Sequence, residues 1–335
     1  MKAIIVGLGS MGRRRARLLH SIDKSIRIIG IDMQAKRRIQ AEKELGIETG
    51  TSLKEVCERY NPDIAFVSTS PLSHSSIISE CLDNNLHVFT ELNLVPDGYE
   101  ENLRKATEKG KVLFLSSTFL YRKELQYIKK SVEECNCKLS YMYHAGQYLP
   151  DWHPWESYKS FFVGDKRTNG CREFMAIEFP WLIDAFGEVD KTISYKSKDS
   201  KLDIGFPDTF QIMIKHKTGH KGLITIDIVS RKAIRRFEVS GDNLYLTWDG
   251  TPDSLHKYDY ENKEDLKISL YESIEKQEGY SPFIIEDAYK SEIENFLNVI
   301  DGDEKPRYSF EQDKSILELI DRIEMKQNEY NGGYQ

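Results

Sequence analysis

The first third of the chain alternates short apolar runs with amphipathic segments. The apolar runs are typical of buried strands and cover residues 3–6, 26–31, 64–67, 86–89 and 112–115. Segments with apolar residues at helical spacing separate them, and the one that starts at Ser52 and Glu55 carries a capping box. Strands that are regularly separated by helices predict a doubly wound parallel sheet with right-handed crossovers.

The hydrophobic pattern changes in the rest of the chain. Apolar and polar residues alternate in 210–214, 224–228 and 244–248, which predicts antiparallel strands covered on one face. Two helical segments follow, around 289–300 and 316–323. We therefore expect an α/β fold with a doubly wound parallel sheet in residues 1–118. Residues 119–335 should form an α+β domain with a largely antiparallel, open-faced sheet.

Composition narrows the class of protein. The chain has 335 residues, a net charge of −7 and 30% charged residues, which argues against a nucleic-acid partner because phosphates attract lysine and arginine. No apolar stretch is long enough to span a membrane, so we expect no membrane association. The 5 cysteines are scattered, which favours reduced thiols in the cytoplasm and no metal site.

A glycine motif marks a candidate dinucleotide site. Gly7, Gly9 and Gly12, with Ser10 and Met11 between them, fit G-x-G-x-x-G directly after a strand and before a helix. Asp32 ends the next predicted strand, where an acidic side chain can bind the ribose hydroxyls of NAD and repel the 2′-phosphate of NADP. We expect NAD, and NADP only if the basic residues 36–38 fold back to hold a phosphate.

Four arginines occupy the first turns of the helix that follows the glycines. Cations are unfavourable at this end of a helix dipole. We expect one of the four to contact the pyrophosphate and the others to lie on the surface; they are Arg13, Arg14, Arg15 and Arg17.

Further motifs resemble the oxidoreductases grouped around glucose-fructose oxidoreductase, inositol dehydrogenase and MocA (the Gfo/Idh/MocA family). The segment VSTSPLSH at 67–74 is similar to the family's T-P-N-x-x-H, and LHVFTE at 86–91 is similar to its G-K-H-V-x-x-E. The segment EIENFL at 292–297 resembles the family's closing helix. This resemblance implies a Rossmann domain that binds the cofactor through the glycine motif, Asp32, Ser68, Thr69, Ser70, His74, Glu91 and Asn93.

Two catalytic motifs of the family are not retained. Its E-K-P is Glu91-Leu92-Asn93 here, and leucine cannot carry a proton or donate a hydrogen bond. The histidine and aspartate of its H-x-x-D align with Ile177 and Pro180.

Other groups would then have to transfer the proton. We expect Glu178 to do so first, since burial among aromatic residues would raise its pKa toward neutrality; His153 and Asp184 are the alternatives. Two other readings stay open. In the first, the chain binds a dinucleotide without turnover, as a sensor or a pseudoenzyme. In the second, it is an enzyme of different redox chemistry, such as imine reduction or epimerisation.

The segment 148–158 is rich in aromatic residues and is the expected substrate wall. Indole faces pack on sugar rings, so we expect Trp152 and Trp155 to contact a sugar-like substrate, with Arg167 meeting a phosphate or carboxylate. The resemblance thus implies an NAD(P)-dependent oxidoreductase of sugars, nucleotide sugars or polyols. The half-apolar strands of the second domain predict a homodimer or homotetramer.

Overall fold

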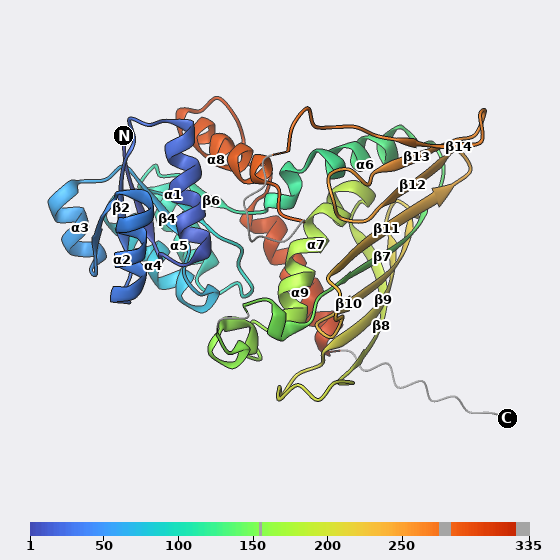
Figure 1. Cartoon of the computed structure of the whole chain (residues 1–335), viewed down its shortest axis with the longest axis horizontal. Coiled ribbons are helices and arrows are strands. Elements are labelled where there is room, and N and C mark those ends of the chain that lie inside the picture. The colour runs from blue at the N-terminus through green and yellow to red at the C-terminus, as the bar shows by residue number, and fades with distance from the viewer. Residues whose placement is uncertain (154–155, 275–282, 326–335) are drawn as a thin grey trace. The chain divides into compact units, whose positions relative to one another are not determined.

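The computed structural model describes residues 1–153, 156–274 and 283–325 and divides the chain into two compact units (Figure 1). The first unit comprises residues 1–121 together with 286–314, and the second comprises 122–285 together with 315–335. A segment from near the end of the chain is therefore part of the N-terminal unit. The boundary expected near residue 118 stays a prediction.

The first unit contains a parallel six-stranded sheet in the order β3-β2-β1-β4-β5-β6. This order confirms the doubly wound fold, because the chain moves outward from β1 in one direction and then in the other. The short polar strand β3 lies at one edge, and the sequence pattern did not predict it. The strands are β1 (Lys2–Val6), β2 (Arg27–Ile31), β3 (Glu48–Gly50), β4 (Ile64–Val67), β5 (His87–Thr90) and β6 (Leu113–Leu115).

Helices connect these strands, as expected from the amphipathic segments. Ser52 caps α3 by accepting a hydrogen bond from the Glu55 amide, which confirms that helix start. α8, from the late segment of the chain, packs on α1. The helices of this unit are α1 (Ser10–Ile22), α2 (Ala35–Leu45), α3 (Leu53–Tyr60), α4 (Pro71–Asp83), α5 (Tyr99–Glu108) and α8 (Glu286–Asp301), with the 3-10 turn η1 (Thr118–Tyr121).

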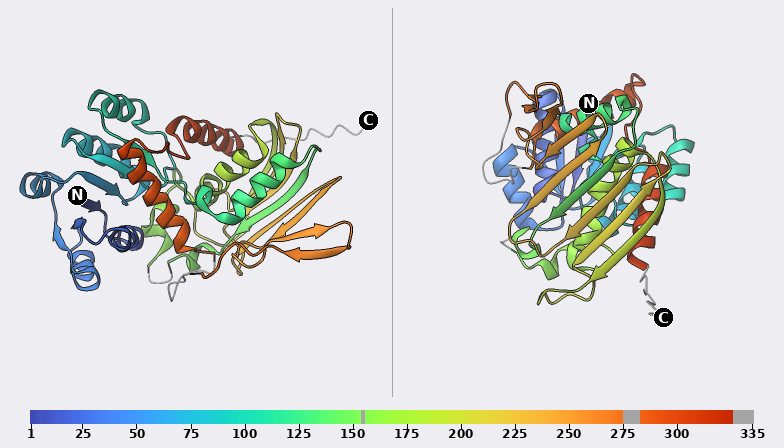
Figure 2. Two further views of the ribbon diagram at one scale, coloured as in Figure 1. Left: turned by 90° about the horizontal axis from the view of Figure 1, so that it is seen from above. Right: turned by 90° about the vertical axis from the view of Figure 1, so that its right-hand side faces the viewer.

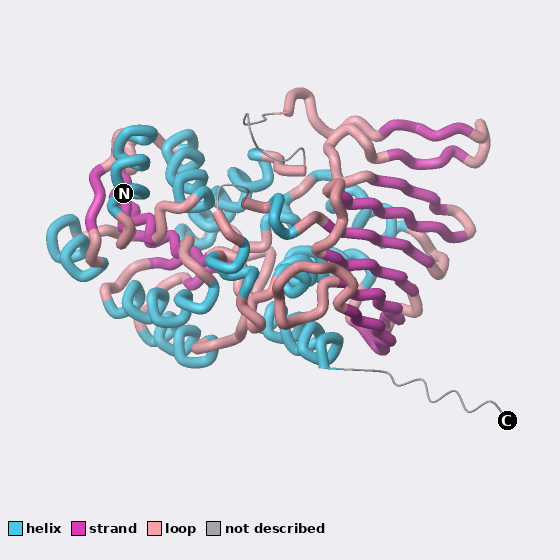
Figure 3. The backbone as a smooth tube through the Cα atoms, turned by 60° about the horizontal axis from the view of Figure 1, so that its bottom comes forward, coloured by secondary structure: helices cyan, strands magenta, loops and turns pink. Residues whose placement is uncertain are grey.

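The second unit contains an eight-stranded sheet in the order β14-β13-β12-β11-β7-β10-β9-β8 (Figure 3). Its neighbours are antiparallel except for β7 and β10, which are parallel, so the expectation of a largely antiparallel sheet is confirmed. The strands are β7 (Ser140–Gly146), β8 (Val189–Ser197), β9 (Thr209–His216), β10 (Lys221–Asp227), β11 (Ile234–Gly241), β12 (Leu244–Trp248), β13 (His256–Asp259) and β14 (Glu264–Lys267).

The helices α6 (Lys123–Glu134) and α7 (Gly170–Phe186) cover one face of this sheet, while the opposite face turns toward the viewer in Figure 2, right. The core on the covered face includes Tyr143, Trp181 and Phe237, which make edge-on ring contacts. α9 (Phe310–Met325) begins in the first unit and ends in the second. Between β7 and α7 the chain forms the 3-10 turns η2 (Leu149–Asp151), η3 (Tyr158–Ser160) and η4 (Phe162–Gly164).

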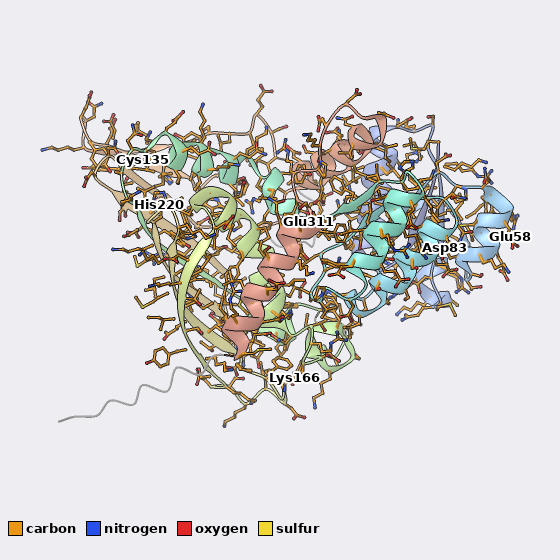
Figure 4. All side chains as sticks on the ribbon, turned by 180° about the vertical axis from the view of Figure 1, so that it is seen from behind. Glu58, Asp83, Cys135, Lys166, His220 and Glu311 are labelled. Carbon is orange, nitrogen blue, oxygen red and sulfur yellow. The ribbon has the colours of Figure 1, made fainter. Side chains whose placement is uncertain are left out.

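The described residues contain neither a candidate membrane span nor a candidate metal centre. No described helix is long and apolar enough to cross a membrane. Within 1–153, 156–274 and 283–325, no cluster of three or more His, Cys, Asp or Glu side chains could hold a metal ion. The five thiols are free, and Figure 4 labels Cys135 at the end of α6.

Candidate functional site

The glycine motif forms a tight turn between β1 and α1. Gly7 has φ +94°, and a Cβ atom there would lie 2.5 Å from the Ser68 carbonyl oxygen. A Cβ on Gly12 would lie 1.8 Å from the Gly7 carbonyl oxygen, so the turn closes only with glycine at both positions. Gly9 differs from both, since a Cβ there would have no atom within 4 Å. Gly9 precedes the first turn of α1, and no side chain caps that helix. The helix N-terminus therefore has the open, amide-lined form that binds a phosphate.

Asp32 lies directly against this turn, at the carboxyl end of β2. Its Oδ2 accepts a hydrogen bond of 2.8 Å from the Leu8 amide, and its Oδ1 accepts one of 2.8 Å from the Gln34 amide. Arg37 approaches the carboxylate at 3.7 Å, and Arg38 donates to the Asp32 carbonyl oxygen. The carboxylate is therefore held in place by the backbone, with two guanidinium groups around it.

His74 and Asn93 form a buried pair below the end of β4. His74 Nε2 lies 3.0 Å from the Thr69 carbonyl oxygen and must donate to it. Burial lowers the pKa of His74, so the ring is neutral near pH 7 and Nδ1 accepts. The atom of Asn93 that lies 2.6 Å from Nδ1 is assigned as Oδ1. Since Nδ1 accepts, the amide must be turned over so that Nδ2 donates to the ring. The pair thus fixes the loop at Thr69 and Ser70.

Glu91 follows β5 and forms a two-pronged ion pair with Arg15. Arg15 Nε lies 2.7 Å from Glu91 Oε1, and Arg15 Nη2 lies 3.0 Å from Glu91 Oε2. The expectation that three of the four arginines of α1 lie on the surface is wrong, because Arg14 and Arg15 are both buried. Each is paired with a glutamate of α8, Arg14 with Glu286 and Arg15 with Glu292, and the sequence pattern gave no sign of these long-range partners.

The second unit holds the expected proton-transfer residues. Glu178, on α7, is fully buried and accepts hydrogen bonds from the Tyr143 hydroxyl at 2.6 Å and from Trp181 Nε1 at 2.9 Å. Its Oε1 pairs with Arg235 Nε at 2.9 Å. Both oxygens of Glu178 are therefore occupied by neighbours of the same unit.

A different carboxyl group on α7 has the character that proton transfer needs. Glu173 is half-buried, and its Oε2 is shielded from solvent with no hydrogen-bond partner in the described part of the chain. Burial raises its pKa to about 8, although the positive charge of Arg235 works in the opposite direction. A carboxyl group with such a pKa exchanges protons near neutral pH.

Helical spacing was the signal that could have identified Glu173. The family's histidine aligns with Ile177, and residue i−4 lies on the same helix face one turn earlier, which is Glu173. The adjacent Glu178 points about 100° away around the helix. Glu173 and Ile177 are both half-buried among fully buried neighbours, so they share the one partly open face of this stretch.

The remaining sequence candidates are spread over the second unit. His153 Nδ1 lies 2.7 Å from Glu156 Oε1, and Asp184 pairs with Lys129 at 2.7 Å on the surface of α7. Trp152 packs edge-on against Phe174, with ring centroids 5.1 Å apart. Arg167 is exposed, and Trp155 lies outside the described residues.

Comparisons with known proteins agree with this geometry. Residues 1–117 match the family model GFO_IDH_MocA, described as an oxidoreductase family with an NAD-binding Rossmann fold. This match confirms the resemblance for the motifs that lie within residues 1–117. A search of curated protein sequences finds no significant match.

Solved structures share the fold over nearly the whole chain. The UDP-N-acetylglucosamine 3-dehydrogenase GnnA of Acidithiobacillus ferrooxidans is 16% identical, with a TM-score of 0.74 and coverage of 97% of this chain and 96% of that one. The WlbA dehydrogenase of Bordetella pertussis, solved with NADH and UDP-GlcNAcA, is 15% identical, with a TM-score of 0.75 and coverage of 96% and 94%. The biliverdin reductase of Synechocystis, solved with biliverdin and NADP⁺, is 15% identical, with a TM-score of 0.72 and coverage of 96% and 97%.

Proposed function

We propose, from the premise that residues 1–117 have the NAD-binding Rossmann fold of the Gfo/Idh/MocA oxidoreductases, that the protein is an NAD(P)-dependent dehydrogenase or reductase. The cofactor is bound by the glycine turn, by Asp32 and by the loops after β4 and β5. When bound, NAD(P) would supply hydride transfer to or from a substrate carbon, and a carboxyl group of this chain would exchange the proton of the reacting hydroxyl.

The cofactor is NAD in preference to NADP. The Asp32 carboxylate is fixed by two backbone amides at the end of β2, the position where an acidic side chain binds the adenine-side ribose. Arg37 and Arg38 are near this carboxylate, and they are the groups that would hold a 2′-phosphate if Asp32 were removed.

The observation that carries the catalytic proposal is Glu173. Its buried, unpartnered oxygen and raised pKa suit it to accept the substrate proton in oxidation and return it in reduction. Leu92 then serves as an apolar wall. Glu178, His153 and Asp184 remain the alternative proton-transfer groups.

The substrate is a sugar, a nucleotide sugar or a related polyol. Support comes from the aromatic segment that contains Trp152, with Arg167 for a charged substituent, and from similar structures whose names include UDP-sugar dehydrogenases. Indole and sugar faces stack well, and the neighbouring carboxylates and histidine can hold hydroxyl groups.

The test is an NAD(H)-linked screen of sugars, nucleotide sugars and their keto forms, followed by four variants in any active pairing. Glu173→Gln should lower kcat by about 100-fold or more, the usual loss when a general base is removed. Glu178→Gln, His153→Ala and Asp184→Asn test the three alternative proton-transfer groups in the same assay.

Two outcomes would overturn parts of this proposal. Full activity of Glu173→Gln would remove Glu173 and return the role to the other three residues. Firm binding of NAD without turnover across the screen would instead identify a non-catalytic dinucleotide-binding protein.

The second unit is also proposed to associate with a second copy of itself through the open sheet face. Four exposed apolar residues form one cross-strand row on β8, β9, β10 and β7, since Ile193 pairs with Met213, Met213 with Leu223, and Leu223 with Met142. Polar residues flank this row, as expected of a self-complementary interface. Light scattering should show a dimer or tetramer that Met213→Lys dissociates, and a wild-type monomer at micromolar concentration would refute association.

A further inference from the structure

The first unit contains a buried charge cluster that the proposed function does not use. Arg15 is fully buried, and its guanidinium pairs with Glu91 on one side and with Glu292 Oε2, at 2.7 Å, on the other. It also lies over the Phe89 ring, 4.5 Å from the centroid. Burial alone would lower the pKa of Arg15, but the two carboxylates outweigh it and raise the pKa, so the cation is permanent.

Glu292 is held as firmly as Arg15. Its Oε1 accepts hydrogen bonds from the Ser117 amide at 2.7 Å and from the Ser116 hydroxyl at 3.0 Å, and its Oε2 accepts one from Thr118 at 2.9 Å. The carboxylate of α8 is thus fixed by the turn after β6. Glu292 therefore holds the Arg15 guanidinium in place, and the contacts that Arg15 makes on its other edge determine where the Glu91 carboxylate lies.

Glu91 is the member of the cluster that reaches the candidate cofactor site. Its side chain is 12% exposed, whereas those of Arg15 and Glu292 are fully enclosed. It follows β5 directly and lies 3.4 Å from the Ser68 hydroxyl at the end of β4. Ligands of a parallel sheet bind beyond these carboxyl ends, and each Glu91 oxygen keeps a lone pair after its contact with Arg15.

We propose that Arg15 is a positioning residue for the cofactor, holding the Glu91 carboxylate so that it accepts a hydrogen bond from the nicotinamide-ribose half of the dinucleotide. Arg15 itself does not touch the cofactor. Glu292 on α8 holds Arg15, so residues from the end of the chain determine the geometry of the N-terminal site. This inference rests on the proposed binding of NAD(P).

The experiment compares binding of NADH with binding of ADP, which lacks the nicotinamide-ribose half, by calorimetry on the full-length protein. Arg15→Lys keeps the charge but loses the two-pronged contact, and it should weaken NADH binding by about tenfold or more while ADP binding changes less than twofold. Glu91→Gln should do the same. In any active pairing, the loss should appear in the KM for the cofactor.

Arg17→Lys is the matched control. Arg17 is also on α1, but it pairs with Glu286 of α8, so both affinities should stay at the wild-type level. Glu292→Gln keeps the shape of the anchor and should shift NADH binding in the same direction as Arg15→Lys by a smaller factor. It serves as the second variant if Arg15→Lys does not fold.

The outcomes separate this inference from the proposed function. Equal weakening of NADH and ADP, or equal effects of Arg15→Lys and Arg17→Lys, would overturn the positioning role while leaving cofactor binding intact. If the wild-type protein bound neither NADH nor ADP, the proposed function would fail and this inference with it.

Discussion

The beginnings of α1 and α7 are both candidate functional regions, but they are built in opposite ways. At α1 the functional element is backbone, since Gly7 and Gly12 allow a turn that any side chain would block and Gly9 leaves the helix end open. At α7 it is a side chain, since Asn169 caps the helix and Glu173 brings a buried carboxyl group. The spacing of glycines in the sequence determines the geometry of the backbone site. The pKa and hydrogen bonding of the carboxyl group are instead determined by the side chains that surround it in the fold.

The largest effects are expected from substitutions in the glycine turn, where one glycine is required for folding and another for cofactor binding. Gly12→Ala should abolish folding of the first unit, because the new Cβ would overlap the Gly7 carbonyl oxygen. Gly9→Ala should keep the wild-type Tm and yet lower NAD affinity by about 100-fold, because its Cβ meets only the space that a pyrophosphate would fill. Circular dichroism and calorimetry measure the two effects, and equal Tm losses would contradict the distinction.

The next effect concerns the paired carboxylate of α7. Glu178→Gln should lower the free energy of unfolding by about 3 kcal/mol, because it breaks the buried ion pair between this carboxylate and Arg235. Glu173 Oε2 has no hydrogen-bond partner among the described residues, so Glu173→Gln should not destabilise the protein at pH 8. Urea unfolding of both variants measures the two free energies of unfolding, and similar decreases in the two variants would contradict this prediction.

The pH dependence of stability provides a smaller and more specific signal. The pKa of Glu173 is about 8 in the folded protein and near 4.5 when exposed, so the folded state binds the extra proton between these values. Its contribution is fully present below pH 4.5 and is lost as pH rises toward 8. Relative to Glu173→Gln, the wild-type protein should therefore lose a few kcal/mol over this window, an amount that follows from the size of the shift. Parallel curves would refute the raised pKa.

The smallest effect is expected at Asp32. Asp32→Asn removes the negative charge near the adenine-side ribose and leaves Arg37 and Arg38 in place. The ratio of NAD to NADP affinity should fall by about tenfold, the scale of one lost charged hydrogen bond. An unchanged ratio would show that this carboxylate serves only the backbone amides of Leu8 and Gln34.

The contrast between the two helix starts also explains what the sequence could predict. Glycine spacing after a strand indicates one backbone geometry, so the turn and the position of Asp32 were predictable. The doubly wound parallel sheet was predictable from the alternation of strands and helices, whereas the edge strand β3, Glu48–Gly50, is too short and polar to show a strand pattern.

Side-chain surroundings were predictable only in part. Glu178 and Glu173 are equally acidic in the sequence, and only the fold shows that the first is surrounded by donors and the second is not. The burial of Arg15 was also hidden, because its partner Glu292 lies 277 residues further along the chain.

That separation has a consequence for biosynthesis. A ribosome adds about 5–20 residues per second, so the nascent first unit carries Arg15 without Glu292 for tens of seconds. Until residues 286–314 emerge, Arg15 keeps its hydrogen bonds to Glu91 and Ser116 but lacks the one to Glu292, and Phe89 lacks its ring partner Phe296 on α8. The N-terminal unit therefore completes its core only after residues 122–285 of the second unit have been synthesised, and a chain truncated before α8 would expose part of that core.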